Sequence, residues 1–158
     1  MKKEKLEAAL SECLVHAQVL QGALSALATH RPFDAARVRA MSDQLRQQLD
    51  QVAYRFMKLQ DTLGDRVLPG LIELAEEPLP ESATFQQKLN RLERLGVIES
   101  AEDWRVLRET RNQIAHEYPD APAIQAAMLE ALLNGALKLI TVWQSASHFA
   151  NQHPADQT

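Results

Sequence analysis

The sequence predicts an all-α protein, an up-down bundle of about five helices. Three observations favour helices over strands. Apolar residues recur at three- and four-residue steps along most of the chain, only five glycines are present, and β-branched residues are too sparse to form a sheet. The chain has 158 residues, 46% of them apolar, which is enough to bury one core. We therefore expect residues 1–150 to form a single domain and residues 151–158 to be a frayed tail.

The first half of the chain predicts two long helices. The first runs from about Lys3 to Thr29, where the sequence HRP ends the pattern. Its apolar stripe consists of Leu6, Leu10, Leu14, Ala17, Leu20, Leu24 and Leu27. The second begins after Asp34, an expected N-cap, and ends at Gly64. Its seam consists of Val38, Met41, Leu45, Leu49, Val52, Phe56, Leu59 and Leu63.

The second half of the chain begins with proline and glycine residues that interrupt helices. The "PG" of residues 69–70 predicts a break, with a short helical continuation over 67–76, and EEPLPES (76–82) is a loop. The segment FQQKLNRLERLGVI then predicts a short amphipathic helix closed by Gly96. Ser100 opens the next helix, with Asp103 three residues on in a variant of the capping box.

A last helix follows the interruption at YPDAP (118–122) and runs from about Ala121 to Ala150. Its apolar positions are Ile124, Met128, Leu132, Ala136, Leu139 and Trp143. No uninterrupted apolar run approaches the roughly 18 residues that a membrane span requires. We therefore expect no membrane partner.

Composition narrows the class of protein further. The single Cys13 cannot form an internal disulfide, and no export signal is evident, so a cytoplasmic location is expected. The formal net charge is −4. A surface with this balance does not attract nucleic acid as a whole, so an RNA partner would have to be held by local charge.

One ionised residue occupies an apolar position on the fourth predicted helix. Trp104, Leu107, Ile114 and Tyr118 form one stripe on a helical wheel, and Arg111 lies in its middle. The neighbouring polar stripe consists of Arg105, Glu109, Asn112 and His116. His116 is about 140° from Arg111 on an ideal helix. Because the helix ends at the Tyr-Pro that follows, the imidazole can still turn back toward the guanidinium.

An arginine and a histidine placed together suit cleavage of RNA without a metal. The imidazole can accept the 2′-hydroxyl proton or protonate the leaving oxygen, and the guanidinium supplies fixed charge to the phosphate oxygens. One histidine cannot do both jobs at once. A two-fold homodimer packed through this face would supply a second copy of the pair.

The stretch RNQIAHEY resembles the R-x4-6-H signature of the HEPN superfamily, in the form found in HepT-like toxins encoded beside minimal nucleotidyltransferase antitoxins. The likeness extends upstream through FQQKLNRLERLGVIESAEDWRVLRETRN and covers roughly residues 85–145. It implies an all-α homodimer with the two signatures facing one cleft. Arg111 and His116 would be catalytic, Asn112 a positioning residue, and Tyr118 the hydroxyl that the partner nucleotidyltransferase modifies with AMP. Products would carry a cyclic phosphate.

Ordinary structural roles stand beside each of these assignments. Arg111 could pair with Glu109, or with Asp50 or Asp61 of the second helix. His116 could cap the helix C-terminus, Asn112 could bond locally, and Tyr118 could belong to the core. The remaining histidines, which have no metal-ligand spacing, are expected at the surface or in packing; they are His16, His30, His148 and His153. We expect no metal and no cofactor.

Three interpretations follow. The first is a metal-independent endoribonuclease toxin of the HEPN type, with a nucleotidyltransferase antitoxin as partner. The second is a non-catalytic adaptor of the same fold that binds a nucleotidyltransferase, and the third is a helical interaction protein whose signature is chance. Lys88, Arg91 and Arg94, which recur at three-residue steps, and Arg108 are possible RNA backbone contacts or simply a solvated face.

Overall fold

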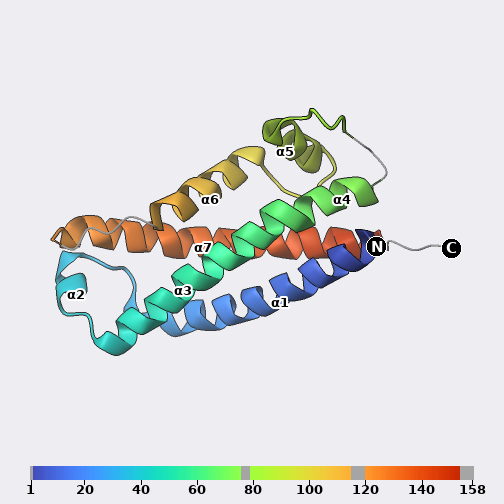
Figure 1. Cartoon of the computed structure of the whole chain (residues 1–158). Helices are drawn as coiled ribbons and strands as arrows, with labels where there is room; N and C mark the ends of the chain where they lie inside the picture. The colour runs from blue at the N-terminus through green and yellow to red at the C-terminus, as the bar shows by residue number, and fades with distance from the viewer. Residues whose placement is uncertain (1, 76–78, 115–119, 154–158) are drawn as a thin grey trace.

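The computed structural model describes residues 2–75, 79–114 and 120–153, and these residues form an all-α bundle without strands. The four longest helices alternate in direction along the chain (Figure 1). They are α1 (Lys2–Leu27), α3 (Asp43–Thr62), α6 (Ala101–Ile114) and α7 (Pro122–Gln152). One continuous apolar core lies between them. The predicted fold class is therefore confirmed at the level of an all-α protein.

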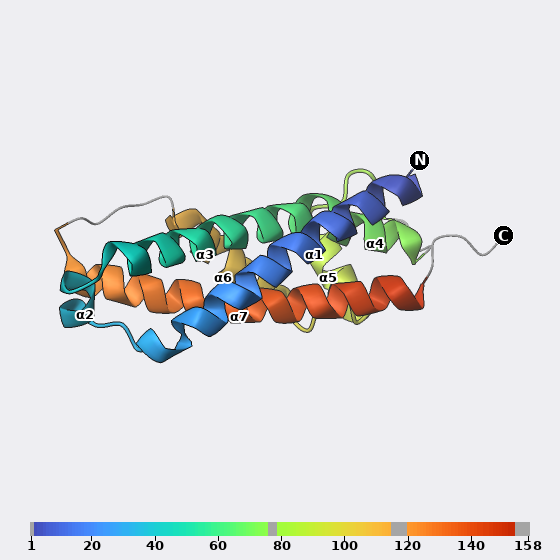
Figure 2. The same ribbon diagram turned by 90° about the horizontal axis from the view of Figure 1, so that it is seen from below.

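Helix α1 crosses α3 and α7 at an angle (Figure 2) and ends in the 3-10 turn η1 (Ala28–His30). Its stripe is buried at Leu6, Ala17, Leu20 and Leu27, as predicted. The prediction was wrong at Leu14, which is 47% exposed. The core-facing position on that turn belongs instead to Cys13, because four-residue steps drift off the face of a helix with 3.6 residues per turn.

The predicted second helix is not continuous. Asp34 does act as an N-cap, accepting a hydrogen bond from the Arg37 backbone N at 2.8 Å, but the helix that it begins is only α2 (Ala35–Arg39). Ser42 caps α3 separately, because its Oγ accepts the Leu45 backbone N at 3.1 Å. Two caps eight residues apart divide the segment, and α2 turns away to pack on α7.

The predicted end at Gly64 lies two residues past the end of α3 and a helical continuation follows as predicted, but the predicted break at Pro69-Gly70 was wrong. Helix α3 passes into the π turn η2 (Leu63–Val67) and on into α4 (Leu68–Leu74). The proline sits in the first turn of α4, where a missing N–H is tolerated. Buried side chains on both sides of it, Val67, Leu68 and Leu71, hold the segment against the core.

The hairpin of α5 (Phe85–Arg94) and α6 agrees with its sequence signals. Thr84 and Gln87 form a reciprocal capping box at the start of α5, and Gly96 follows the helix with a φ of +80°. The Asp103 backbone N donates to the Ser100 Oγ at 3.2 Å, which confirms Ser100 as the cap of α6. These bonds fix where α6 begins, and so set the position of every residue on it.

Helix α7 packs against most of the other helices of the bundle. It contacts α1, α2, α3, α4 and α6, and it continues to Gln152, two residues past the predicted end. Within the described residues it alone is long and apolar enough to cross a membrane, and 33% of its most apolar window is buried inside the bundle. Ile124, predicted to be apolar core, is 49% exposed. The buried face begins at Ala126 instead.

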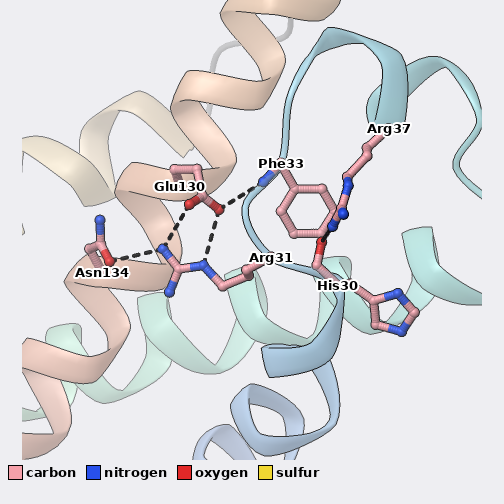
Figure 3. A network of polar contacts seen from close by, with 6 residues as sticks. All are labelled: His30, Arg31, Phe33, Arg37, Glu130 and Asn134. Atoms are coloured by element: carbon pink, nitrogen blue, oxygen red, sulfur yellow. Dashed lines mark hydrogen bonds and ion pairs between the residues drawn. The ribbon is translucent and has the colours of Figure 1, made fainter.

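A polar network ties the connection between α1 and α2 to α7 (Figure 3). Arg31 donates from Nε and Nη2 to the two carboxylate oxygens of Glu130, at 3.0 and 3.1 Å, and from Nη2 to Asn134 Oδ1 at 2.9 Å. The same carboxylate accepts the Phe33 backbone N at 3.3 Å. These contacts lower the pKa of Glu130, the hydrogen bond from Arg31 most of all.

Candidate functional site

Arg111 lies in the last turn of α6 and reaches across to α3. Its Nε donates to Asp61 Oδ1 at 3.1 Å and its Nη2 donates to Asp61 Oδ2 at 3.2 Å, which is a bidentate pair. Of the three acids that the sequence offered as structural partners, Asp61 is the one that Arg111 contacts. The charged position in the apolar stripe is therefore explained by a carboxylate on the facing helix.

The pair is only half-buried. The Arg111 side chain is 36% exposed and the Asp61 side chain 44%. The hydrogen bond and the charge of Asp61 raise the pKa of Arg111, and the charge of Asp65 adds to this effect. The guanidinium is thus permanently ionised, held in one orientation and still in contact with solvent. A group in this state can receive an anion on the edge that Asp61 does not use.

The register between α3 and α6 follows from a contact that lies one helical turn after Asp61 and near the start of α6. A Cβ added at Gly64 would lie 2.9 Å from Trp104 Cζ2, so only glycine lets the indole ring pack so close to the helix backbone. Trp104 is buried at the start of α6, two turns before Arg111. Gly64 is also part of the π turn, a feature often found near functional sites. The Trp104 contact therefore brings Arg111 within reach of Asp61.

The remaining signature residues are only partly placed. Asn112 is exposed on α6, and none of its side-chain atoms bonds to another residue in the described part of the chain. His116 and Tyr118 lie outside the described residues. The structure thus positions the arginine and the asparagine of the signature, and the predicted pairing of Arg111 with His116 stays a prediction.

Three of the predicted RNA contacts lie on α5, and the fourth, Arg108, lies on α6 against the first residue of α5. The guanidinium of Arg108 stacks over the Phe85 ring at 5.2 Å, at the first residue of α5. Lys88 and Arg91 are half-buried and Arg94 is exposed at the far end of that helix. Helix α5 as a whole lies beside the start of α6 and away from its last turn (Figure 1). Of the four, only Arg108 shares a helix with Arg111, one turn before it.

A second polar cluster lies between α1 and α3, and the sequence did not predict it. The Arg55 Nη1 lies 2.9 Å from His16 Nδ1, and Glu12 contacts both His16 Nε2 (3.9 Å) and Arg66. Burial lowers the pKa of His16, and the charges of Arg55 and Lys58 act in the same direction. His16 is thus a neutral, buried histidine.

The buried thiol of Cys13 is unsuited to nucleophilic chemistry, because burial raises its pKa to about 12. Among residues 2–75, 79–114 and 120–153, no three or more His, Cys, Asp or Glu side chains are grouped so that they could hold a metal ion.

A groove beside the last turn of α6 was also missed by sequence reasoning. It has a volume of about 730 Å³ and lies between α2, α3, α6 and α7. Thr110, Gln113 and Ile114 line one wall of it, on the two sides of Arg111 in the sequence. A pairing of α2 with α7 that the sequence does not indicate creates this groove.

Comparisons of the chain with family models, with curated proteins and with solved structures find no match. The resemblance to the HEPN superfamily accordingly depends on the signature and the run of residues before it.

Proposed function

We propose that this chain is a metal-independent endoribonuclease of the HEPN type that works as a homodimer. The observation that carries the proposal is the state of Arg111 within the signature RNQIAHEY. Arg111 lies in the last turn of α6, and Asp61 of α3 holds its guanidinium in place. More than a third of the Arg111 side chain remains exposed. An oriented cation of this kind suits a phosphate on which negative charge builds up.

The reaction uses the RNA's own 2′-hydroxyl as the nucleophile. An imidazole accepts the 2′-hydroxyl proton while the oxygen attacks the adjacent phosphorus, and the bond from phosphorus to the 5′-oxygen of the next nucleotide breaks. A second imidazole, protonated, gives its proton to that leaving oxygen. The products are a 2′,3′-cyclic phosphate and a free 5′-hydroxyl. His116 of each subunit supplies one imidazole, and Arg111 stabilises the charge on the phosphate oxygens.

Asp61 fits this scheme as a positioning residue. A guanidinium has five N–H donors in one plane, and Asp61 occupies the edge formed by Nε and Nη2. No hydrogen bond joins Nη1 to another residue in the part of the chain that the structure describes. The Nη1 edge can then meet phosphate oxygens without breaking the pair.

Cleavage of a single-stranded oligoribonucleotide in the presence of EDTA tests the proposal. We expect fragments that end in a cyclic phosphate, and a loss of activity in both Arg111→Ala and His116→Ala. Arg105→Ala is the matched control, because Arg105 is an exposed arginine of the same helix that pairs with Glu102. If both signature variants cleave RNA as fast as the unaltered protein does, at concentrations where the dimer forms, the ribonuclease proposal is wrong.

A non-catalytic adaptor that binds a minimal nucleotidyltransferase is the second candidate function. The Arg111–Asp61 pair favours it, since the pair satisfies the guanidinium in part without any substrate. The resemblance implies the same partner for the toxin, which that partner would silence by transferring AMP to Tyr118. Co-purification with the product of a neighbouring nucleotidyltransferase gene, combined with no RNA cleavage by the free chain, would favour the adaptor.

A further inference from the structure

The groove between α2, α3, α6 and α7 has the character of a small-molecule site. Its volume of about 730 Å³ falls within the range of natural ligand pockets. Six apolar side chains from all four helices contribute to its lining; they are Val38, Leu49, Ala53, Ile114, Leu129 and Leu132. Such a lining suits a flat, largely apolar body such as a nucleobase.

The polar groups of the groove are mainly cationic. Arg39 of α2 and Arg46 of α3 are both exposed, and neither guanidinium bonds to another described residue. Asp50 is the one acidic side chain among the lining residues. The groove thus has a net positive charge in a chain whose overall charge is −4. This local excess complements an anionic ligand.

The groove also has an amide group that could recognise the edge of a base. Gln113 of α6 lines it, and its amide offers a donor and an acceptor. The groove therefore combines three properties that suit a nucleotide: an apolar floor, an amide at the edge and, for a phosphate, two cations that bond to no other described residue.

Arg111 and the groove occupy neighbouring faces of the same helical turn. Thr110, Gln113 and Ile114 face the groove, whereas Arg111 faces Asp61. Successive residues on a helix are about 100° apart and rise by about 1.5 Å, so Thr110 and Arg111 present their side chains to adjacent surfaces. A strand whose phosphate contacts Arg111 would have its next nucleotide at the mouth of the groove.

We propose that this groove binds one nucleotide of the RNA strand, next to the bond that is cleaved, with the base on the apolar floor and a phosphate against Arg39 and Arg46. The inference rests on the proposed ribonuclease function and names the part of the substrate that the signature does not contact. It makes the groove a binding subsite, separate from the catalytic residues.

Binding of a fluorescent ten-nucleotide oligoribonucleotide tests the inference, with Arg111→Ala as the common background so that the probe is not cut. We expect Arg46→Glu to weaken binding about tenfold. The slope of log K against the logarithm of the salt concentration should also become shallower by about 1, which corresponds to one lost phosphate contact. Lys5→Glu is the matched control, because it makes the same charge change at an exposed residue of α1, far from the groove. It should change affinity less than twofold, within the scatter of the measurement.

A second variant, Ala53→Phe, fills the groove without changing any charge, and circular dichroism checks that it folds. It should also weaken binding of the probe. In a separate competition experiment, a mononucleotide should displace the probe from the protein with Ala53 but not from the Ala53→Phe variant. If Arg46→Glu binds the probe as well as Lys5→Glu does, the inference is wrong.

Cleavage assays on the same groove variants, with Arg111 intact, separate the two proposals. Normal binding and cleavage in the groove variants, with activity lost in Arg111→Ala, would overturn the groove and keep the ribonuclease. Weakened RNA binding in Arg46→Glu, with no cleavage by the unaltered protein, would keep the groove and overturn the ribonuclease.

Discussion

Two arginine–carboxylate pairs in this molecule have the same bidentate geometry. Arg31 and Arg111 each donate from Nε and Nη2 to the two oxygens of one carboxylate, at distances between 3.0 and 3.2 Å. The first pair joins the loop after α1 to α7, and the second joins α6 to α3. Local geometry alone therefore does not distinguish a structural arginine from a functional one.

The surroundings of the two pairs do differ. Arg31 also bonds to Asn134, and Glu130 also accepts the Phe33 backbone N (Figure 3). These side chains are 22% and 26% exposed, against 36% and 44% for Arg111 and Asp61. The Arg31 pair bonds to two further groups and is the less exposed of the two, whereas the Arg111 pair bonds to no third residue in the described part of the chain and is more exposed. We infer that the first serves stability and the second is available to a ligand.

Replacing each arginine by alanine is the strongest way to test this difference. Arg111→Ala should lower kcat/KM for RNA at least about 100-fold, because it removes the cation at the reacting phosphate. It should cost about 1 kcal/mol or less in free energy of unfolding, because exposed pairs contribute little. Urea denaturation and cleavage, measured on the same preparation, give both values.

Arg31→Ala should have the opposite pattern. It leaves the Glu130 carboxylate and the Asn134 amide without their shared partner, which should lower the free energy of unfolding by about 2 kcal/mol. For a chain of this size that corresponds to a melting temperature about 4–8 °C lower. Cleavage by the folded fraction should be unchanged. Equal losses of stability in the two variants would contradict the comparison.

Changes at Asp61 sharpen the comparison with a smaller effect. Asp61→Asn keeps the shape of the side chain but removes one acceptor and the charge, so Arg111 loses its fixed orientation. We expect kcat to fall about tenfold with little change in KM. Asp61→Glu, which keeps the charge, should recover part of the loss. An increase in kcat in Asp61→Asn would mean that Asp61 competes with the phosphate rather than positioning the arginine.

The sequence predicted most of the helices because their signals are local. Ser100 and Gly96 mark helix ends through signals within a few residues, and both act as expected, whereas the capping box of Thr84 and Gln87 was not predicted. Asp34 was read correctly as a cap, but Ser42 eight residues later was not, so α2 and α3 were predicted as one helix. A second cap inside a periodic segment was the signal that could have corrected this prediction.

The contents of the site depend on distances between helices, which no local signal sets. Asp61 was one of three acids that could have paired with Arg111, and the choice among them depends on the approach of Trp104 to Gly64. The groove depends on α2 packing against α7. Periodicity predicts which face of a helix is buried, but it does not predict the register of one helix against another.

The dependence of the free energy of unfolding on pH tests the structural role of the Arg31 pair. The contacts of Glu130 lower its pKa in the folded chain, so its carboxylate stabilises the fold above the pKa of the unfolded chain and loses that contribution as pH falls through the folded value. Urea denaturation between about pH 6 and about pH 3 should therefore show a fall in the free energy of unfolding that is smaller in Glu130→Gln. The variant should start less stable at pH 6, because an amide cannot accept both hydrogen bonds from Arg31. If Glu130→Gln loses as much stability on acidification as the unaltered protein does, the ionised Glu130 carboxylate is not what stabilises the fold at the Arg31 pair.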